Sequence, residues 1–330
     1  MSNVAIVQDG FKREDPLSTL KLVSKPIPRP APGQVVVHLK LRNIHVFDFI
    51  TLRGTGVANG TPGSEGYGIV HEVGKRVTKL HEGQRVVPII TEAITKGNGT
   101  WQEYICLDAE FVWPLPDAIT DEQAAQFVIN PWTSYSMLKE LAAVPEGEYL
   151  LQTAAGSTLG KQVITLAKHL NIKLINVVRR SEQKAELKAL GAEEIICSGD
   201  EDVVARVKEI TGGKGAWGAL DAVAGTMTQT LASCMRDGGQ IFVYGMLGGL
   251  AASINVMDLW RNVQPVGWTL FKILLNPEKR EACAAEVAAL MIDGVIQVAE
   301  VEKYDLTDFK KAMVRADEVG SYRKILLASA

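Results

Sequence analysis

The chain contains 330 residues, of which 47% are hydrophobic and 22% are charged, and its formal net charge is −3 at pH 7. This length predicts two domains with buried cores, and the small net charge argues against a basic surface that binds nucleic acid or an anionic membrane. No apolar run approaches the ~20 residues of a membrane span. The N-terminus has no features of a secretory or transit signal, so we expect a cytoplasmic protein.

The first part of the chain, up to about residue 116, predicts a β-rich domain. Short runs of β-forming residues are separated by glycines and prolines, at residues 3–8, 34–41, 67–73, 84–89 and 101–107. From Thr120 the apolar residues follow a helical period, and we expect two helices separated at Asn130 and Pro131.

Residues 149–180 predict a strand, a helix and a second, parallel strand that together bind a dinucleotide. The turn before the helix consists of small residues. The first N–H groups of a helix lack partners inside it, and the helix dipole adds partial positive charge, so a pyrophosphate can bind there. The strict fingerprint of three glycines is not present, because only its last glycine is kept. The expected contacts at this turn are Gly156, Ser157, Thr158, Leu159 and Gly160.

Two arginines, Arg179 and Arg180, end the second strand of this unit, where a carboxylate would accept the ribose 2′-hydroxyl of NAD. A carboxylate repels a 2′-phosphate, whereas a guanidinium binds one through charge-assisted hydrogen bonds. We therefore predict NADPH as the cofactor. The alternative interpretation is a pair of solvated surface arginines at the start of the next helix.

Further strands alternate with helices after residue 180, at residues 194–197, 218–222 and 240–244. Such alternation predicts a parallel sheet covered by helices on both faces. A helix around residues 277–291 and a last apolar strand at residues 324–328 complete the chain, and we expect this strand to return to the first domain. The predicted domains are residues 1–118 with 266–330, and residues 119–265.

Four motifs resemble the medium-chain dehydrogenase/reductase superfamily, and the resemblance covers essentially the whole chain. GSEGYGIVHEVG (63–74) is similar to the family pattern G-x-E-G-x-G-x-V-x-x-V-G, and INPWTSYSML (129–138) is similar to N-P-x-T-A-Y-x-M-L of the enoyl reductases. SxLG (157–160) and INVVR (175–179) belong to the same set. The resemblance implies an α/β protein with a GroES-like β-rich catalytic domain and a Rossmann domain, which is a doubly wound parallel sheet. It is strongest with the zinc-free branch, which contains quinone oxidoreductases and 2-enoyl thioester reductases.

The zinc ligands of zinc-containing relatives are missing at the matching positions. Ser64 replaces a ligand histidine, and His45 stands where the first cysteine ligand precedes an aspartate, here Asp48. The four cysteines lie far apart and form no C-x-x-C pair; they are Cys106, Cys197, Cys234 and Cys283. A single possible ligand cannot form a zinc site, so we expect no metal.

The candidate catalytic residues are His45, Tyr67 and Tyr135. Hydride transfer to a quinone or an activated double bond places negative charge on an oxygen, which needs a hydrogen-bond donor, and a proton must follow. His45 replaces an asparagine of the family pattern and can serve either task, although a purely structural histidine is an equally good interpretation. The two tyrosines carry O–H groups, but such residues are more often packing residues. The proton-donating tyrosine of enoyl reductases falls on Gly56 here, so that phenol is missing.

The resemblance implies further cofactor contacts later in the chain. Thr133 can equally be a helix cap, and the apolar stretch that contains Trp268 and Phe271 can equally be a dimer face. Lys324 matches the family's terminal Gly-Lys, except that Arg323 replaces the glycine, and a surface role is as good an interpretation. The expected contacts are Thr133, Tyr244, Gly245, Met246, Trp268 and Lys324.

The sequence therefore predicts a zinc-independent, NADPH-dependent oxidoreductase that reduces a quinone or an activated C=C bond by hydride transfer. One alternative is a 2-enoyl thioester reductase, which should need a cluster of basic residues for CoA or acyl-carrier phosphates; the lysines of this sequence are scattered. Another is a catalytically silent NADPH-binding sensor. The expected partners are a quinone, an enone or an enoyl thioester, together with a second copy in a homodimer, and neither nucleic acid nor a membrane.

Overall fold

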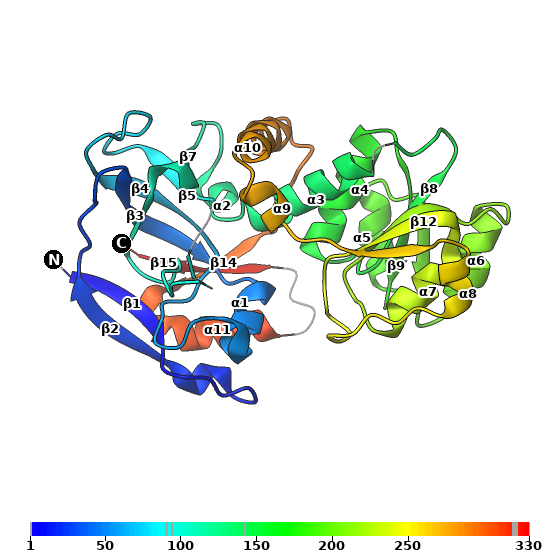
Figure 1. Ribbon diagram of the computed structural model, residues 1–330, viewed down its shortest axis with the longest axis horizontal. Coiled ribbons are helices and arrows are strands. Elements are labelled where there is room, and N and C mark those ends of the chain that lie inside the picture. Colours follow the sequence, from blue (N-terminus) through cyan, green and yellow to red (C-terminus); the bar gives the residue numbers. More distant parts are fainter. Residues whose placement is uncertain (1, 90–91, 94, 142, 319–322, 330) are drawn as a thin grey trace. The chain divides into compact units, whose positions relative to one another are not determined.

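The computed structural model describes residues 2–89, 92–93, 95–141, 143–318 and 323–329. The chain forms two compact units (Figure 1). The first consists of Met1–Ile129 and Val298–Ala330, and the second of Asn130–Gln297. Among the described residues, none of the helices combines the length and the apolarity that a membrane crossing requires.

The first unit is built on a mixed sheet in the order β14-β15-β3-β4-β5-β7, with β6 paired to β3, and on a separate ribbon of β1 and β2. Leu326 of β15 lies opposite Asn43 of β3, so the last strand joins the sheet of the first unit, as expected. The strands are β1 (Ser2–Gln8), β2 (Leu20–Pro26), β3 (Gln34–Asn43), β4 (Glu65–Val73), β5 (Arg85–Pro88), β6 (Tyr104–Asp108), β7 (Val112–Pro114), β14 (Val301–Asp305) and β15 (Lys324–Ala328).

Alternation of apolar side chains along the strands forms the core of this unit. Val35, Val37 and Leu39 of β3 point to the same face, because successive side chains of a strand alternate, and they pack with Val70 and Ile105. Short helices complete the unit: η1 (Pro16–Thr19), α1 (Val46–Ile50), the π-helical turn η2 (Thr51–Thr55), η3 (Ala109–Phe111), α2 (Asp121–Ala124), η4 (Leu306–Asp308) and α11 (Phe309–Asp317).

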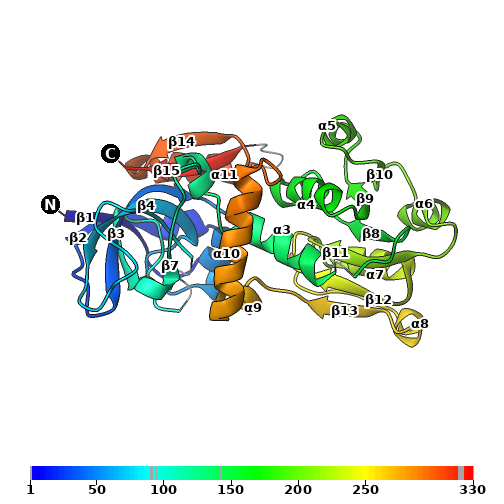
Figure 2. The ribbon, with the colours of Figure 1, turned by 90° about the horizontal axis from the view of Figure 1, so that it is seen from above.

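The second unit contains a parallel sheet in the order β10-β9-β8-β11-β12-β13, with helices on both faces (Figure 2). From β8 the chain first winds outward to β9 and β10, then returns to β11 and winds the other way. The order therefore reverses between β8 and β11, which confirms the predicted doubly wound sheet. The strands are β8 (Tyr149–Gln152), β9 (Lys173–Val178), β10 (Glu194–Cys197), β11 (Ala216–Asp221), β12 (Met235–Val243) and β13 (Gln264–Gly267).

The helices of the second unit extend past the boundary expected at residue 265. They are α3 (Ile129–Glu140), α4 (Thr158–His169), α5 (Gln183–Ala189), α6 (Val203–Ile210), α7 (Thr226–Cys234), α8 (Val256–Trp260), α9 (Phe271–Leu274) and α10 (Pro277–Ile292). Helix α10 belongs with α3, because Glu286 forms an ion pair with Lys139 at 2.9 Å and Cys283 lies 3.6 Å from the Ser136 hydroxyl. These contacts explain why the second unit reaches Gln297 rather than ending near residue 265.

Candidate functional site

The turn between β8 and α4 has the geometry of an anion site. Ser157 is the N-cap of α4, and its Oγ accepts a hydrogen bond from the Gly160 N–H at 3.1 Å. The N–H groups of Thr158 and Leu159 have no acceptor among the described residues, as is usual in the first turn of a helix. A Cβ at Gly160 would lie 2.6 Å from the Ala155 carbonyl oxygen, so only glycine allows the helix to pack this closely. The turn therefore offers free donors to an anion.

Arg179 and Arg180 follow β9 directly and are exposed. Within the described part of the chain neither guanidinium forms an ion pair. The Ala155 N–H donates to the Val177 carbonyl oxygen at 3.1 Å, which joins the small-residue turn to the end of the strand that carries the arginines. The turn and the arginines therefore lie at the same edge of the sheet, where the strands have their carboxyl ends.

The expected contacts after β12 and β13 reach the same edge. The N–H groups of Tyr244 and Gly245 donate to the Asp221 carbonyl oxygen at 3.0 and 3.2 Å. A Cβ at Gly245 would lie 2.3 Å from the Ala222 carbonyl oxygen, so the backbones approach too closely for any other residue. Met246 follows and is exposed. Burial, and secondarily the Asp221 carboxylate, raises the pKa of the Tyr244 phenol.

Trp268, one of the expected cofactor contacts, has a buried side chain. Its backbone N–H donates to the Val243 carbonyl oxygen at 2.9 Å, so it also lies at the carboxyl edge. Its side chain is 2% exposed, however, and the indole N–H donates to the Glu140 carboxylate at 3.0 Å. The side chain is thus part of the interior of the second unit.

Thr133 and Tyr135 lie on α3, and both are largely buried. Thr133 is inside the helix rather than at its start, so the interpretation of this residue as a helix cap is wrong. The Tyr135 hydroxyl accepts a hydrogen bond from Lys139 at 2.7 Å, and Lys139 also pairs with Glu286. This ion pair holds the phenol against α10.

His45 is the N-cap of α1 in the first unit. Its Nδ1 accepts a hydrogen bond from the Phe47 N–H at 3.1 Å, and the Asp48 carboxylate accepts one from the His45 N–H at 2.7 Å. Because Nδ1 is the acceptor, the neutral ring carries its proton on Nε2. His45 is half-buried, and its imidazole can act as a neutral hydrogen-bond donor.

Asp48 of α1, Glu65 of β4 and Lys324 of β15 interact electrostatically in the first unit. The two carboxylates are each 1% exposed. Burial raises the pKa of Asp48 to about 7 and also raises that of Glu65. Burial lowers the pKa of the half-buried Lys324, while the two acids oppose this effect. These interactions argue against a simple surface role for Lys324.

Tyr67 lies on β4 and is 3% exposed. Its hydroxyl accepts a hydrogen bond from the Arg85 guanidinium at 3.1 Å, and Arg85 also pairs with Asp121 at 2.8 Å. Burial raises the pKa of this phenol, and Asp121 adds to the effect. These contacts favour the packing interpretation of Tyr67 over a catalytic one.

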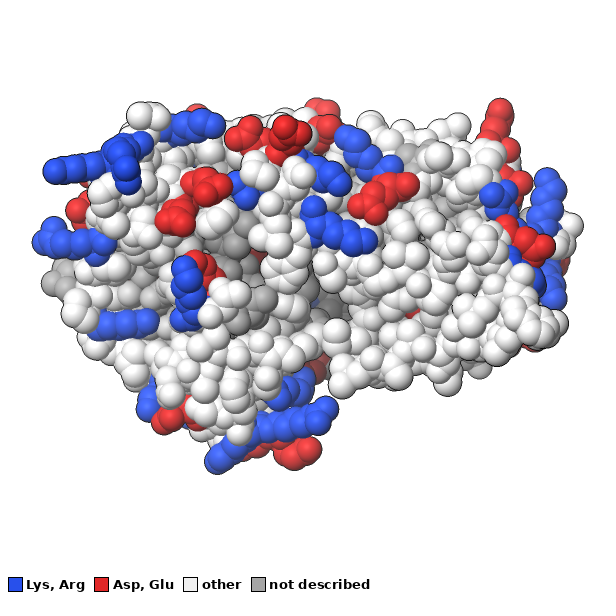
Figure 3. All heavy atoms as spheres, viewed as in Figure 1, with Lys and Arg blue, Asp and Glu red and all other residues white. Residues whose placement is uncertain are grey.

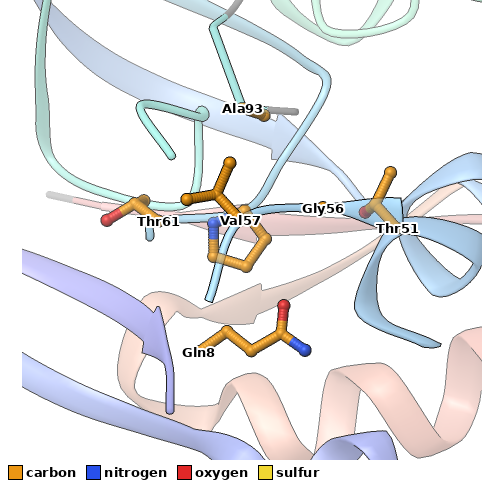
Figure 4. A pocket seen from close by; sticks show the side chains of 7 residues that line it. Gln8, Thr51, Gly56, Val57, Thr61 and Ala93 are labelled. Carbon is orange, nitrogen blue, oxygen red and sulfur yellow. The ribbon is translucent and has the colours of Figure 1, made fainter. Parts of the chain in front are cut away.

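A small pocket of the first unit lies at Gly56, the position of the missing phenol (Figure 4). Its space is about 200 Å³, part of it open to solvent, and Val57 lies between Thr51 and Thr61 in the view of Figure 4. A Cβ at Gly56 would lie 3.0 Å from the Thr51 carbonyl oxygen, so a larger residue requires the backbone to move. The pocket is lined by Gln8, Thr51, Gly56, Val57, Thr61, Pro62 and Ala93.

No group of three or more histidine, cysteine, aspartate or glutamate side chains that could hold a metal occurs among the residues that the structure describes. The sequence pattern does not indicate that two acids, Glu65 in a motif and Asp221 in a strand, are buried hydrogen-bond acceptors. Asp221 could have been recognised as a carboxylate in an otherwise apolar strand, because it follows Ala219 and Leu220.

The chain matches two family models, "Zinc-binding dehydrogenase" over residues 158–284 and "Alcohol dehydrogenase GroES-like domain" over residues 31–117. It is 31% identical over 320 residues to a mitochondrial enoyl-[acyl-carrier-protein] reductase of Caenorhabditis elegans, covering 93% of this chain and 90% of the relative. It is 29% identical over 288 residues to a quinone oxidoreductase of Pseudomonas aeruginosa, covering 86% and 87%.

Solved structures with similar folds cover the whole length of the chain. A quinone oxidoreductase of Pseudomonas syringae pv. tomato has a TM-score of 0.89 at 28% identity, with 100% of both chains covered. A quinone oxidoreductase of Escherichia coli complexed with NADPH has a TM-score of 0.88 at 25% identity, with 99% of this chain and 100% of that chain covered.

Proposed function

We propose that this chain, which belongs to the zinc-free branch of the medium-chain dehydrogenase/reductase superfamily, is an NADPH-dependent oxidoreductase. Its substrate would be a quinone or a compound with an activated C=C bond. The main support for the proposal is that unpartnered N–H groups and two exposed arginines lie at the same carboxyl edge of the parallel sheet. The relatives named quinone oxidoreductase and enoyl reductase support this chemistry.

The residues at this edge fit the chemical groups of NADPH. The free N–H groups of Thr158 and Leu159 suit a diphosphate, which binds readily at the start of a helix. Arg179 and Arg180 suit the 2′-phosphate, because a guanidinium forms paired hydrogen bonds with phosphate oxygens. Gly245 would act indirectly, because it lets the turn after β12 pack against the Ala222 carbonyl oxygen. One relative solved in complex with NADPH supports the same cofactor.

His45 would be the residue that acts on the substrate. NADPH, when bound, supplies a hydride, and negative charge then develops on an oxygen of the quinone or enone. A neutral imidazole whose proton lies on Nε2 can donate a hydrogen bond to that oxygen. Tyr67 and Tyr135 are weaker candidates, since both hydroxyls are held by cationic side chains.

A 2-enoyl thioester reductase remains the second candidate, and the enoyl reductase at 31% identity favours it. Two observations weigh against it. A thioester that carries several phosphates would need a cluster of basic side chains. On the face shown in Figure 3, basic and acidic side chains are interspersed. In addition, Gly56 stands where those enzymes have their tyrosine.

The test is single-turnover oxidation of NADPH by the purified chain, with a panel of quinones, enones and enoyl thioesters. Oxidation by quinones or enones supports the proposal, and oxidation by thioesters alone supports the second candidate. Binding of NADPH without oxidation by any member of the panel would indicate a sensor. Absence of NADPH binding would overturn the proposal altogether.

A homodimer is also proposed. Helix α8 exposes an apolar surface next to β13, the last strand of its sheet, and an edge strand can pair with another chain. Val256, Met257, Leu259 and Trp260 form this surface, and Trp260 is 77% exposed. Sedimentation of the wild type and of Trp260→Glu should give a dimer and a monomer, and a monomeric wild type would refute the idea. A cytoplasmic location stays a prediction.

A further inference from the structure

Asp221, the last residue of β11, is completely buried, and four donors surround its carboxylate. Oδ1 accepts hydrogen bonds from the N–H groups of Val223 at 2.9 Å and Ala224 at 3.1 Å, and from the Thr153 hydroxyl at 3.3 Å. Oδ2 accepts one from the Thr228 hydroxyl at 2.6 Å. A buried carboxylate is tolerated only when it is satisfied in this way.

These bonds connect three strand ends of the second unit. Thr153 directly follows β8, and its hydroxyl also accepts a hydrogen bond from the Ala222 N–H at 2.9 Å. The Asp221 carbonyl oxygen accepts hydrogen bonds from the N–H groups of Tyr244 and Gly245, which follow β12. Asp221 thus joins β8, β11 and β12 beside the place where the strand order reverses, which is where α/β sheets bind ligands.

The turns that follow β8 and β11 both contain an alanine in the left-handed region, Ala154 at φ 50° and Ala224 at φ 60°. This conformation costs about 1–2 kcal/mol for a residue with a Cβ, and it persists only where the surroundings enforce it. Asp221 binds the Ala224 N–H directly. It also accepts a hydrogen bond from Thr153, the residue that directly precedes Ala154. Ala154 begins the turn that leads to Ser157 and to the free N–H groups of α4.

We propose that Asp221 is a positioning residue for the cofactor, which keeps the two strained turns at this edge in the shape that receives the NADPH diphosphate. The inference rests on the proposed function. Asp221 has no exposed surface, so its side chain would act without contacting the cofactor. Its effect reaches the binding site through Thr153 on one side and through the turn after β11 on the other. The preformed turns reduce the ordering that cofactor binding would otherwise require.

The experiment measures the NADPH dissociation constant and thermal unfolding for Asp221→Leu, which keeps the branched skeleton of the side chain and removes every acceptor. We expect NADPH to bind at least tenfold more weakly, with the NADPH to NADH affinity ratio unchanged, because the 2′-phosphate site is separate. Asp221→Asn keeps an oxygen for the turn and should bind within about threefold of wild type. Thr153→Val, a milder change in case Asp221→Leu does not fold, should weaken binding several-fold.

Two further variants separate positioning from a loss of stability. Ala224→Gly, added to Asp221→Leu, should recover much of the NADPH affinity, since glycine adopts a positive φ without strain. Asp258→Leu removes another buried carboxylate, which accepts hydrogen bonds from Gln229 and Arg261 in the same unit. It should lower the melting temperature and leave NADPH affinity unchanged.

The outcomes distinguish this inference from the proposed function. If the wild type binds NADPH and both Asp221→Leu and Thr153→Val bind it equally well, the inference fails and the proposed function survives. A matching loss of affinity in Asp258→Leu would also refute it, because the effect would then be general destabilisation. A wild type that does not bind NADPH would remove both.

Discussion

The buried carboxylate of Glu65 accepts a hydrogen bond from the Asn43 side chain at 2.7 Å. Its other oxygen accepts hydrogen bonds from the N–H groups of Val128 and Ile129, both at 2.8 Å. This carboxylate therefore caps the start of α3. The Oδ1 atom of Asn43 is buried and has no hydrogen-bond partner among the described residues. A rotation of the Asn43 amide would therefore present an acceptor in place of a donor.

Glu65→Gln should consequently be tolerated, whereas Glu65→Ala should destabilise the protein. In Glu65→Gln the side-chain oxygen still caps α3, and its amide can donate to the rotated Asn43. Glu65→Ala leaves three buried or partly buried donors unpaired, each costing about 1–3 kcal/mol, so we expect a loss of at least about 3 kcal/mol in the free energy of unfolding. Urea denaturation of both variants checks this. Equal losses in the two would contradict the capping role.

Asp48→Asn should remove a dependence of stability on pH. Burial raises the pKa of Asp48 from 3.8 to about 7, so the folded chain keeps this proton to a higher pH than the unfolded chain. The wild type therefore loses stability as pH rises from about 4 to about 7 and levels off above that. At about 1.4 kcal/mol per pKa unit the loss amounts to a few kcal/mol.

Asn at position 48 does not titrate and still offers an oxygen to the His45 N–H, so it isolates this effect. Glu65 has a raised pKa as well and contributes a slope of the same sign, which is why the wild type is compared with Asp48→Asn rather than considered alone. The difference in unfolding free energy should favour Asp48→Asn increasingly between about pH 4 and about pH 7. A difference that stays constant over this range would show that Asp48 is ionised throughout.

The local features of the fold could be predicted from the sequence because short-range chemistry determines them. Alternating apolar residues predicted β3, and the small residues before Gly160 predicted the turn that Ser157 caps. The break expected at Asn130 and Pro131 was wrong, since α3 begins at Ile129 and includes both residues. Proline is accepted in the first turn of a helix, where its missing N–H has no partner to lose.

The remaining parts depend on contacts between residues far apart in the sequence. Glu65 caps a helix that begins 64 positions later, and Thr153 reaches a carboxylate 68 positions away. Neither pairing leaves a pattern in one sequence. The second unit likewise includes α10, which contacts α3 through distant residues such as Glu286 and Lys139. Residue types alone could not indicate these partners.

Arg179→Asp should weaken NADPH binding far more than NADH binding. The guanidinium would lose its charge-assisted bonds to the 2′-phosphate, and the new carboxylate would repel that phosphate, whereas NADH carries only a hydroxyl there. We expect the ratio of the two affinities to fall at least tenfold in titrations of both cofactors. Lys208→Asp, an exposed site on α6, makes the same change in charge and should leave the ratio unaltered. Equal weakening of both cofactors by Arg179→Asp would count against the 2′-phosphate assignment.

His45→Asn and His45→Ala should separate a catalytic histidine from a structural one. Asparagine is a good N-cap and also carries an N–H donor, so it can replace both nitrogens of the ring, and turnover should stay within about tenfold of wild type. Alanine supplies neither, and loss of a donor to a developing oxyanion lowers kcat by about 10²–10³. Turnover with a quinone that the wild type reduces, corrected for the folded fraction, measures the difference. If His45→Ala is merely less stable and its folded fraction keeps full turnover, the imidazole serves only to cap α1, and the donor to the oxygen must be another group.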